Sequence, residues 1–354
     1  MLKKKRAIIS IASLLVLALL VAYFAYSNAT SYVAIINGER ITEAEYRFFL
    51  YSEKRVMEMD KTQEEIDALW NSKIDGVDAT EVVKQNALEN AKKYKIQYFK
   101  AKEQGLFLND NDYKSIEDSI NVLLGQMSGF EGTRKQAEKS FKEWFGISVK
   151  EYRNIVEKLH LGYKFALKEQ ENNIKVTEQE LKDHFKENSG NFIKATANIL
   201  LFYKRDVPKF YKRDVPNGYT MLTDEEIEES KKKAEEALKE IKDGKRFISV
   251  AAKYAEDKKV ELEENTEVKM GADMEQEIID WAVKSNVGDV ELIETDLGFN
   301  VIEILSLTSF EDERDNVRSV VAGEKYEKIL DEWAKDSIYN LELNEKALNK
   351  IKVR

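Results

Sequence analysis

The stretch Val287–Ser306 reads V-G-D-V-E-L-I-E-T-D-L-G-F-N-V-I-E-I-L-S and decides the fold of the region around it. In its first half apolar residues are interleaved with acidic ones, as in a half-buried strand. Asp296-Leu297-Gly298 has the composition of a turn, and Phe299–Leu305 is a second run rich in β-branched and aromatic residues. The stretch therefore predicts a β-hairpin that closes a small sheet.

The composition excludes several kinds of chemistry. A chain of 354 residues has room for two compact domains at roughly 150 residues each. It has no cysteine, which excludes disulfides, thiolate metal sites and a cysteine nucleophile. The two histidines, His160 and His184, are too few for a His-rich metal site and lie far from the hairpin, so we expect both to be structural. We expect no metal and no cofactor.

The N-terminal segment predicts transport across a membrane. Four basic residues, Lys3–Arg6, precede Ala7–Ala25, an uncharged apolar run of 19 residues. As a helix this run is about 28 Å long, against about 30 Å for the hydrocarbon core of a bilayer. We expect a retained single-pass anchor with the body on the extracytoplasmic side. The alternative is a signal peptide cleaved after Ala29, and both place the body outside the cytoplasm.

The rest of the chain is acidic. Removing the four N-terminal basic residues from the total of 56 leaves 52 against 66 acidic residues, a net charge of −14. No basic stripe is concentrated anywhere along the sequence. We therefore expect no nucleic-acid partner.

The first half of the body predicts a mainly helical domain. Tyr32–Asn37 reads as a short strand, and Asn37-Gly38 is a tight-turn signal. Thr42-Glu43-Ala44-Glu45 is a capping box that starts a helix. Apolar residues at spacings of three and four, together with a further capping box, predict the helices that follow: Glu81–Glu103, Asp110–Gly125, Thr133–Phe145 and Ser148–Glu171.

The second half predicts a small α+β domain followed by further helix. Lys194–Tyr203 ends in a continuous apolar run, as in a buried central strand. After it we expect helices at Thr223–Asp243, Phe247–Tyr254 and Glu275–Ser285, an acidic edge strand or flap at Val260–Val268, the hairpin, and a helical C-terminal segment from Glu311. Between strand and helix, Tyr203–Pro208 and Tyr211–Pro216 both read Y-K-R-D-V-P. A neutral duplication within a lengthened loop and a dedicated binding loop both fit this repeat.

Three motifs in order carry a resemblance to a known family. They are V-A-I-I-N-G-E-R-I-T-E-A-E-Y from Val33, V-T-E-Q-E-L-K-D-H-F from Val176, and D-G-K-R-F-I-S-V-A-A-K-Y-A-E-D from Asp243. Together with the hairpin they resemble the extracytoplasmic foldases of the PrsA and SurA kind, which carry a parvulin-like prolyl isomerase domain. The resemblance implies an α+β chain in which an antiparallel parvulin-like domain (191–308) is inserted in a SurA-N-like helical chaperone domain. That chaperone domain (30–190) would be completed by the C-terminal segment (309–354), and residues 1–29 would form the basic flank and anchor.

The resemblance also implies a site. Matched to the family motifs, its polar positions are Asn198, Asp257 and Asn300, and the first and last of these are histidines in the family. The apolar residues that would hold a substrate proline are Met274, Ile278, Trp281 and Phe299. Amide rotation needs no nucleophile and no obligatory proton transfer, and its barrier of about 18–20 kcal/mol falls when resonance is weakened by an apolar pocket and hydrogen-bond donors. Asparagine keeps a donor and an acceptor but cannot titrate, so it weakens the case for catalysis.

Three functions remain open at this point. The first is a membrane-anchored foldase that binds unfolded or newly secreted polypeptides, with weak prolyl isomerase activity and with a homodimer allowed. The second is a non-enzymatic, degenerate parvulin module that docks one envelope partner. The third is an unrelated anchored helical protein, which would require Asn198 and Asn300 not to be neighbours in one small sheet.

Overall fold

The computed structural model describes residues 32–128, 132–205, 222–254 and 256–353. They divide into two compact units. One, here called the helical unit, contains the described residues as far as Lys175 together with those from Ala322 onward. The other, the sheet unit, is Val176–Val321. The first unit is therefore built from both ends of the described chain.

The helical unit begins with a small antiparallel sheet. β1 (Tyr32–Ile36) pairs with β2 (Glu39–Thr42) through the predicted Asn37-Gly38 turn, where both residues have positive φ. On its other side β1 pairs with β9 (Glu342–Leu343), and the main-chain N–H of Asn344 donates to the carbonyl of Val33. The C-terminal segment is thus hydrogen-bonded to the first described strand.

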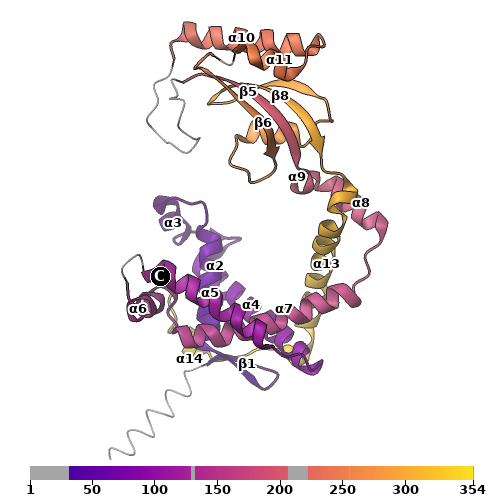
Figure 1. Cartoon of the computed structure of the whole chain (residues 1–354). Helices are drawn as coiled ribbons and strands as arrows, with labels where there is room; N and C mark the ends of the chain where they lie inside the picture. The colour runs from indigo at the N-terminus through magenta and orange to yellow at the C-terminus, as the bar shows by residue number, and fades with distance from the viewer. Residues whose placement is uncertain (1–31, 129–131, 206–221, 255, 354) are drawn as a thin grey trace, which may run out of the picture. The chain divides into compact units, whose positions relative to one another are not determined.

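Helices make up most of this unit (Figure 1). The predicted capping boxes at Thr42/Glu45 and Ser148/Glu151 are both present. The predicted buried face of α4 is confirmed at Val83, Ala87, Ala91 and Tyr94. The elements are α2 (Glu43–Glu58), α3 (Gln63–Leu69), β3 (Lys73–Ile74), β4 (Val77–Asp78), α4 (Ala79–Glu103), α5 (Asp110–Ser128), α6 (Arg134–Phe145), α7 (Val149–Asn172), η2 (Ser337–Tyr339) and α14 (Glu345–Leu348).

The sheet unit contains one four-stranded antiparallel sheet in the order β6-β5-β8-β7. The predicted hairpin is confirmed as β7 and β8, and the predicted central strand is β5, which is buried along nearly its whole length. The elements are α8 (Glu178–Glu187), α9 (Ser189–Phe192), β5 (Ala195–Tyr203), α10 (Asp224–Lys242), α11 (Phe247–Ala251), η1 (Ala252–Tyr254), β6 (Val260–Val268), α12 (Gln276–Ala282), β7 (Val290–Glu294) and β8 (Gly298–Leu307).

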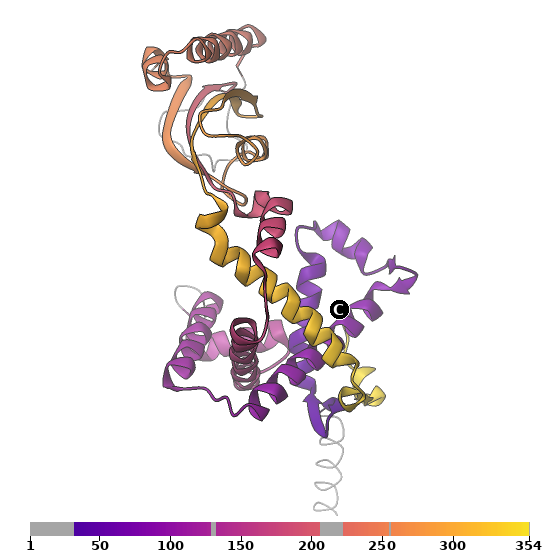
Figure 2. The same ribbon diagram turned by 90° about the vertical axis from the view of Figure 1, so that its right-hand side faces the viewer.

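Helices cover both faces of this sheet (Figure 2). On one face Leu200, Phe202 and Val301 pack against α10 and α11. On the other face Ile199, Ile302 and Ile304 pack against α12. Since successive side chains of a strand point to opposite faces, membership of one or the other core shows the direction of each sheet residue.

The sheet unit extends beyond the domain limits of 191 and 308 that the resemblance implied. α8 and the first part of α13 (Phe310–Lys335) share a core formed by Leu181, Phe192, Val317 and Val321. Arg314 also donates to the carboxylate of Glu178 at 2.8 Å. These contacts make the unit begin at Val176 and end at Val321.

The predicted anchor Ala7–Ala25 and most of the duplicated segment lie outside the described residues. Within the described part of the chain, none of the helices combines the length and the apolar character needed to cross a membrane.

Candidate functional site

Asn300 lies on β8 and projects toward the α12 face of the sheet. Its neighbours Phe299 and Val301 belong to the core under α10 and α11, so the alternation of the strand directs Asn300 to the opposite side. Its side chain is 1% exposed, and its amide nitrogen donates to the carbonyl of Ile293 and to Thr295 Oγ1, both at 3.3 Å. Its amide oxygen is buried and has no hydrogen-bond partner in the structure.

Asn198 lies on β5 and projects toward the other face. Ala197 and Ile199 on either side of it belong to the core under α12. Its amide nitrogen donates to a carboxylate oxygen of Glu303 at 3.0 Å, and its amide oxygen accepts the main-chain N–H of Asn265 at 3.2 Å. Asn265 has a φ of +54° where the register between β5 and β6 shifts. Asn198 therefore supports an irregularity of the sheet.

The structure consequently does not bring the two asparagines together. They lie on paired neighbouring strands, but the partner of Asn300 on β5 is Leu201, three residues from Asn198. That offset is about 10 Å along the strand. Because they also face opposite cores, no substrate group on one face can contact both side chains. The two residues are nevertheless neighbours in one small sheet.

Asp257 lies apart from both asparagines, on the α10 side of the unit. One carboxylate oxygen accepts from Lys233 of α10 at 3.0 Å, and the other accepts the main-chain N–H of Lys259 at 2.9 Å. Partial burial would raise the pKa of Asp257, but the hydrogen bonds from Lys259 and Lys233 outweigh it and lower the pKa below its ordinary value. The ionised carboxylate holds α10 to the loop that precedes β6.

The predicted substrate-binding residues divide in the same way. Ile278 is fully buried in the core under α12, and Met274 and Trp281 pack against that core while remaining partly exposed. Phe299 is 2% exposed in the opposite core, with the ammonium of Lys204 at 4.7 Å from its ring centroid. The α12 face thus gathers Asn300, Met274, Ile278 and Trp281, whereas Asn198, Asp257 and Phe299 lie elsewhere.

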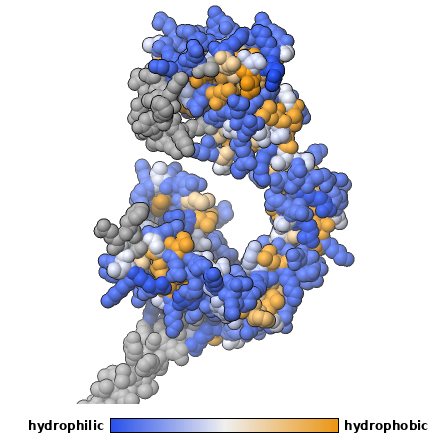
Figure 3. Space-filling model, viewed as in Figure 1, coloured by the Kyte–Doolittle hydropathy of each residue, from blue (hydrophilic) through white to orange (hydrophobic). Residues whose placement is uncertain are grey.

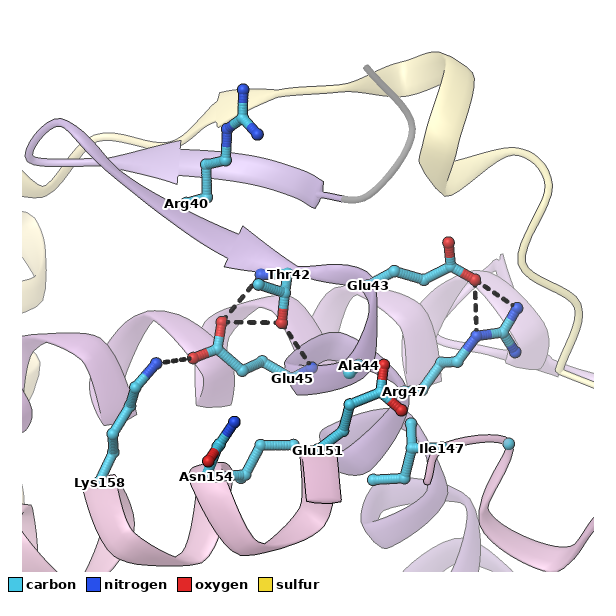
Figure 4. A pocket seen from close by; sticks show the side chains of 12 residues that line it. Arg40, Thr42, Glu43, Ala44, Glu45, Arg47, Ile147, Glu151, Asn154 and Lys158 are labelled. Carbon is cyan, nitrogen blue, oxygen red and sulfur yellow. Dashed lines mark hydrogen bonds and ion pairs between the residues drawn. The ribbon is translucent and has the colours of Figure 1, made fainter. Parts of the chain in front are cut away.

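The helical unit contains a polar pocket that the sequence did not reveal. It has a volume of about 590 Å³ and lies between the β2–α2 corner and the start of α7. Figure 4 shows Glu45 between Thr42 and Lys158, with Glu151 and Asn154 on the α7 wall. The Glu45 carboxylate accepts from Lys158 at 2.8 Å and from the Tyr94 hydroxyl at 3.0 Å.

Behind this pocket Glu45 forms a buried ion pair with Lys95 of α4 at 3.1 Å, and each side chain is 2% exposed. Burial would raise the pKa of Glu45, but the charges of Lys95 and Lys158 outweigh it and lower the pKa. Burial lowers the pKa of Lys95. One carboxylate therefore links α2, α4 and α7. The available sequence signal was a lysine at position 95, four residues after Ala91 on the apolar face of α4.

Neither histidine lies at these sites. His160 Nε2 is 3.3 Å from a carboxylate oxygen of Asp112, and the His184 ring packs against Phe192. In the described ranges, no group of three or more histidine, aspartate or glutamate side chains is placed to hold a metal ion.

Comparison with known proteins supplies a family for the sheet unit. Residues 215–306 match the family of rotamases described as PPIC-type PPIase domains. Over 311 residues the chain is 23% identical to the foldase protein PrsA of Caldanaerobacter subterraneus subsp. tengcongensis, covering 85% of this chain and 82% of the relative.

Two solved structures are among those with a similar arrangement. The foldase protein PrsA of Streptococcus pneumoniae is 14% identical with a TM-score of 0.32, covering 75% of this chain and 90% of that one. A SurA-like chaperone structure from Campylobacter jejuni is 13% identical with a TM-score of 0.30, covering 88% and 99%. With its PPIC-type match and its similarity to a PrsA foldase along most of its length, the chain is a relative of the PrsA/SurA-type foldases that carries a parvulin-like domain.

Proposed function

We propose that this chain is an extracytoplasmic foldase that binds unfolded or newly secreted polypeptides. The observation that carries the proposal is the similarity to a PrsA foldase over 311 residues, which spans both units and is not confined to the rotamase match. The helical unit would be a SurA-N-like chaperone domain, with the parvulin-like unit inserted in it. Residues 7–25 would anchor the protein in the cell membrane as a single span.

The surface offers contacts for such clients. Most of the visible surface is hydrophilic, but hydrophobic patches occur on both units (Figure 3). In the helical unit the exposed apolar side chains include Val56, Met59 and Trp144, which are 62%, 63% and 66% exposed. Apolar side chains among charged ones are suited to extended polypeptide of varied sequence.

The test of this proposal is direct binding of a permanently unfolded protein. A reduced and alkylated secretory protein, labelled with a fluorophore, is titrated with the purified chain while anisotropy is measured. The same protein in its native, disulfide-bonded form is the control. We expect saturable binding of the unfolded form alone. Equal binding of both forms, or binding of neither, would contradict the proposal.

We further propose that any prolyl isomerase activity is weak and resides at the α12 face. There Asn300 supplies the polar group, and Met274, Ile278 and Trp281 supply the apolar wall. Catalytic roles for Asn198 and Asp257, and a substrate contact for Phe299, stay predictions from the resemblance. The hydrogen bonds of Asn198 to Glu303 and Asn265 favour a structural role for it.

One observation favours the second candidate, a non-enzymatic module that docks a single envelope partner. The separation of Asn198 and Asn300 onto opposite faces leaves no polar pair of the kind that the family resemblance implied. Breadth of binding distinguishes the candidates. A foldase binds several unrelated unfolded proteins with similar affinity, whereas a docking module binds one folded partner.

A further inference from the structure

A basic groove runs between α6 and α7 in the helical unit. Its volume is about 410 Å³, and five of its eight lining residues are cationic while one is acidic. The cations are Arg134, Lys139, Lys142, Lys150 and Arg153, and the acid is Glu138. This sign is opposite to the net charge of −10 carried by the whole chain. The groove is invisible in the sequence because α6 and α7 each alternate basic with acidic residues.

Part of this charge is already neutralised. Arg134 pairs with Glu138 at 3.1 Å, Lys139 pairs with Glu143 at 3.6 Å, and Arg153 donates to Glu117 of α5. Lys142 and Lys150 are exposed, and neither forms an ion pair within the described part of the chain. Two uncompensated positive charges therefore remain in a concave surface. The positive end of the α7 dipole adds to their potential.

We propose that this groove binds short acidic segments of extended polypeptide. The proposal rests on the proposed function for the nature of its occupant, a polypeptide client, and it adds the charge and the place of one contact. Paired ammonium groups favour carboxylates at alternate positions, since residues two apart on an extended chain lie on one side of it. Each such contact is charge-assisted and partly screened by salt.

The overall charge distinguishes a short acidic segment from a long polyanion. A nucleic acid presents negative charge along its whole length, so it also faces the acidic remainder of the protein. Repulsion from that remainder acts within about 10 Å at 0.1 M salt. A short acidic stretch in an otherwise neutral polypeptide meets only the groove. The structure therefore favours polypeptide over nucleic acid.

The experiment measures binding of a labelled peptide that alternates glutamate with valine to the purified full chain, by fluorescence anisotropy at low and high salt. A peptide with lysine in place of glutamate and a single-stranded oligonucleotide of equal charge are the comparison ligands. The variant Lys142→Glu/Lys150→Glu reverses the two uncompensated charges. The matched control Lys102→Glu/Lys328→Glu reverses two other exposed lysines of the same unit. Circular dichroism verifies that both variants are folded.

We expect salt-sensitive binding of the acidic peptide alone. Its Kd should rise about tenfold in the groove variant and change less than about twofold in the control. Equal losses in both variants would show a general charge effect and overturn the proposal, as would stronger binding of the oligonucleotide or the lysine peptide. Binding of a neutral unfolded protein by both variants at wild-type strength separates this outcome from failure of the proposed function.

Discussion

Glu45 and Lys95 form an ion pair of 3.1 Å in which both side chains are 2% exposed. The carboxylate that starts α2 as the partner of its N-cap Thr42 is the same one that neutralises a lysine inside α4. Lys158 of α7 donates to it from the wall of the pocket. The packing of three helices therefore depends on one ionised group.

Replacing Glu45 with Gln should destabilise the helical unit. The change leaves Lys95 buried without its counter-ion, which typically costs about 3–5 kcal/mol. Urea unfolding followed by circular dichroism measures the loss. Glu43→Gln is the matched control, because Glu43 pairs with Arg47 at a half-exposed position and its loss should cost less than about 1 kcal/mol. Similar losses in both variants would contradict the role given to Glu45.

The same carboxylate should make stability depend on pH in acid. The pKa of Glu45 is lowered below its ordinary value of 4.5, so the unfolded chain binds this proton more readily than the folded one. Its contribution is complete above about pH 4.5 and is lost as the pH falls through the folded-state pKa. Unfolding midpoints of wild type and Glu45→Gln should therefore converge below pH 4.5. A difference that stays constant across this range would argue against a depressed pKa.

Replacing Gly298 with Ala should unfold the sheet unit. A Cβ at this position would lie 2.2 Å from the carbonyl oxygen of Phe202 on the neighbouring strand. Main chain cannot move away without breaking the pairing of β5 with β8, so we expect a loss of at least about 3 kcal/mol. Thermal unfolding measures it. Gly190→Ala, where nothing lies near the added atom, serves as the control and should be nearly neutral.

The two asparagines should respond differently in a protease-coupled assay of X-Pro peptides. Asn198→Ala should lower stability by about 1–3 kcal/mol, because it leaves the N–H of Asn265 without its acceptor, and should leave any isomerisation rate unchanged. Asn300→Ala and Trp281→Ala should reduce any acceleration over the uncatalysed time of tens to hundreds of seconds. Acceleration that disappears in Asn198→Ala while the fold is intact would place catalysis on the wrong face here.

Local patterns predicted the elements well. The hairpin of β7 and β8, the buried strand β5 and four capping boxes all follow from residues close together in sequence. The relation between Asn198 and Asn300 could not be predicted in this way. It depends on the register of β5 against β8 and on irregularities between strands, which are set by non-local packing.

The charged sites escaped for a related reason. Glu45, Lys95 and Lys158 come from three helices, and each is unremarkable within its own segment. The basic groove likewise combines residues of α6 and α7 whose acidic neighbours point elsewhere. Sequence periodicity finds an apolar face, but it does not show which charges meet across helices.

The central claim, that the chain binds unfolded polypeptide and so acts as a foldase, is tested most directly by aggregation kinetics. A chemically denatured client is diluted into buffer with the purified chain in equal molar amount, and light scattering is followed, with serum albumin in place of the chain as control. We predict slower and smaller scattering for several unrelated clients, with native client recovered afterwards. Scattering identical to the albumin control for every client would contradict the account.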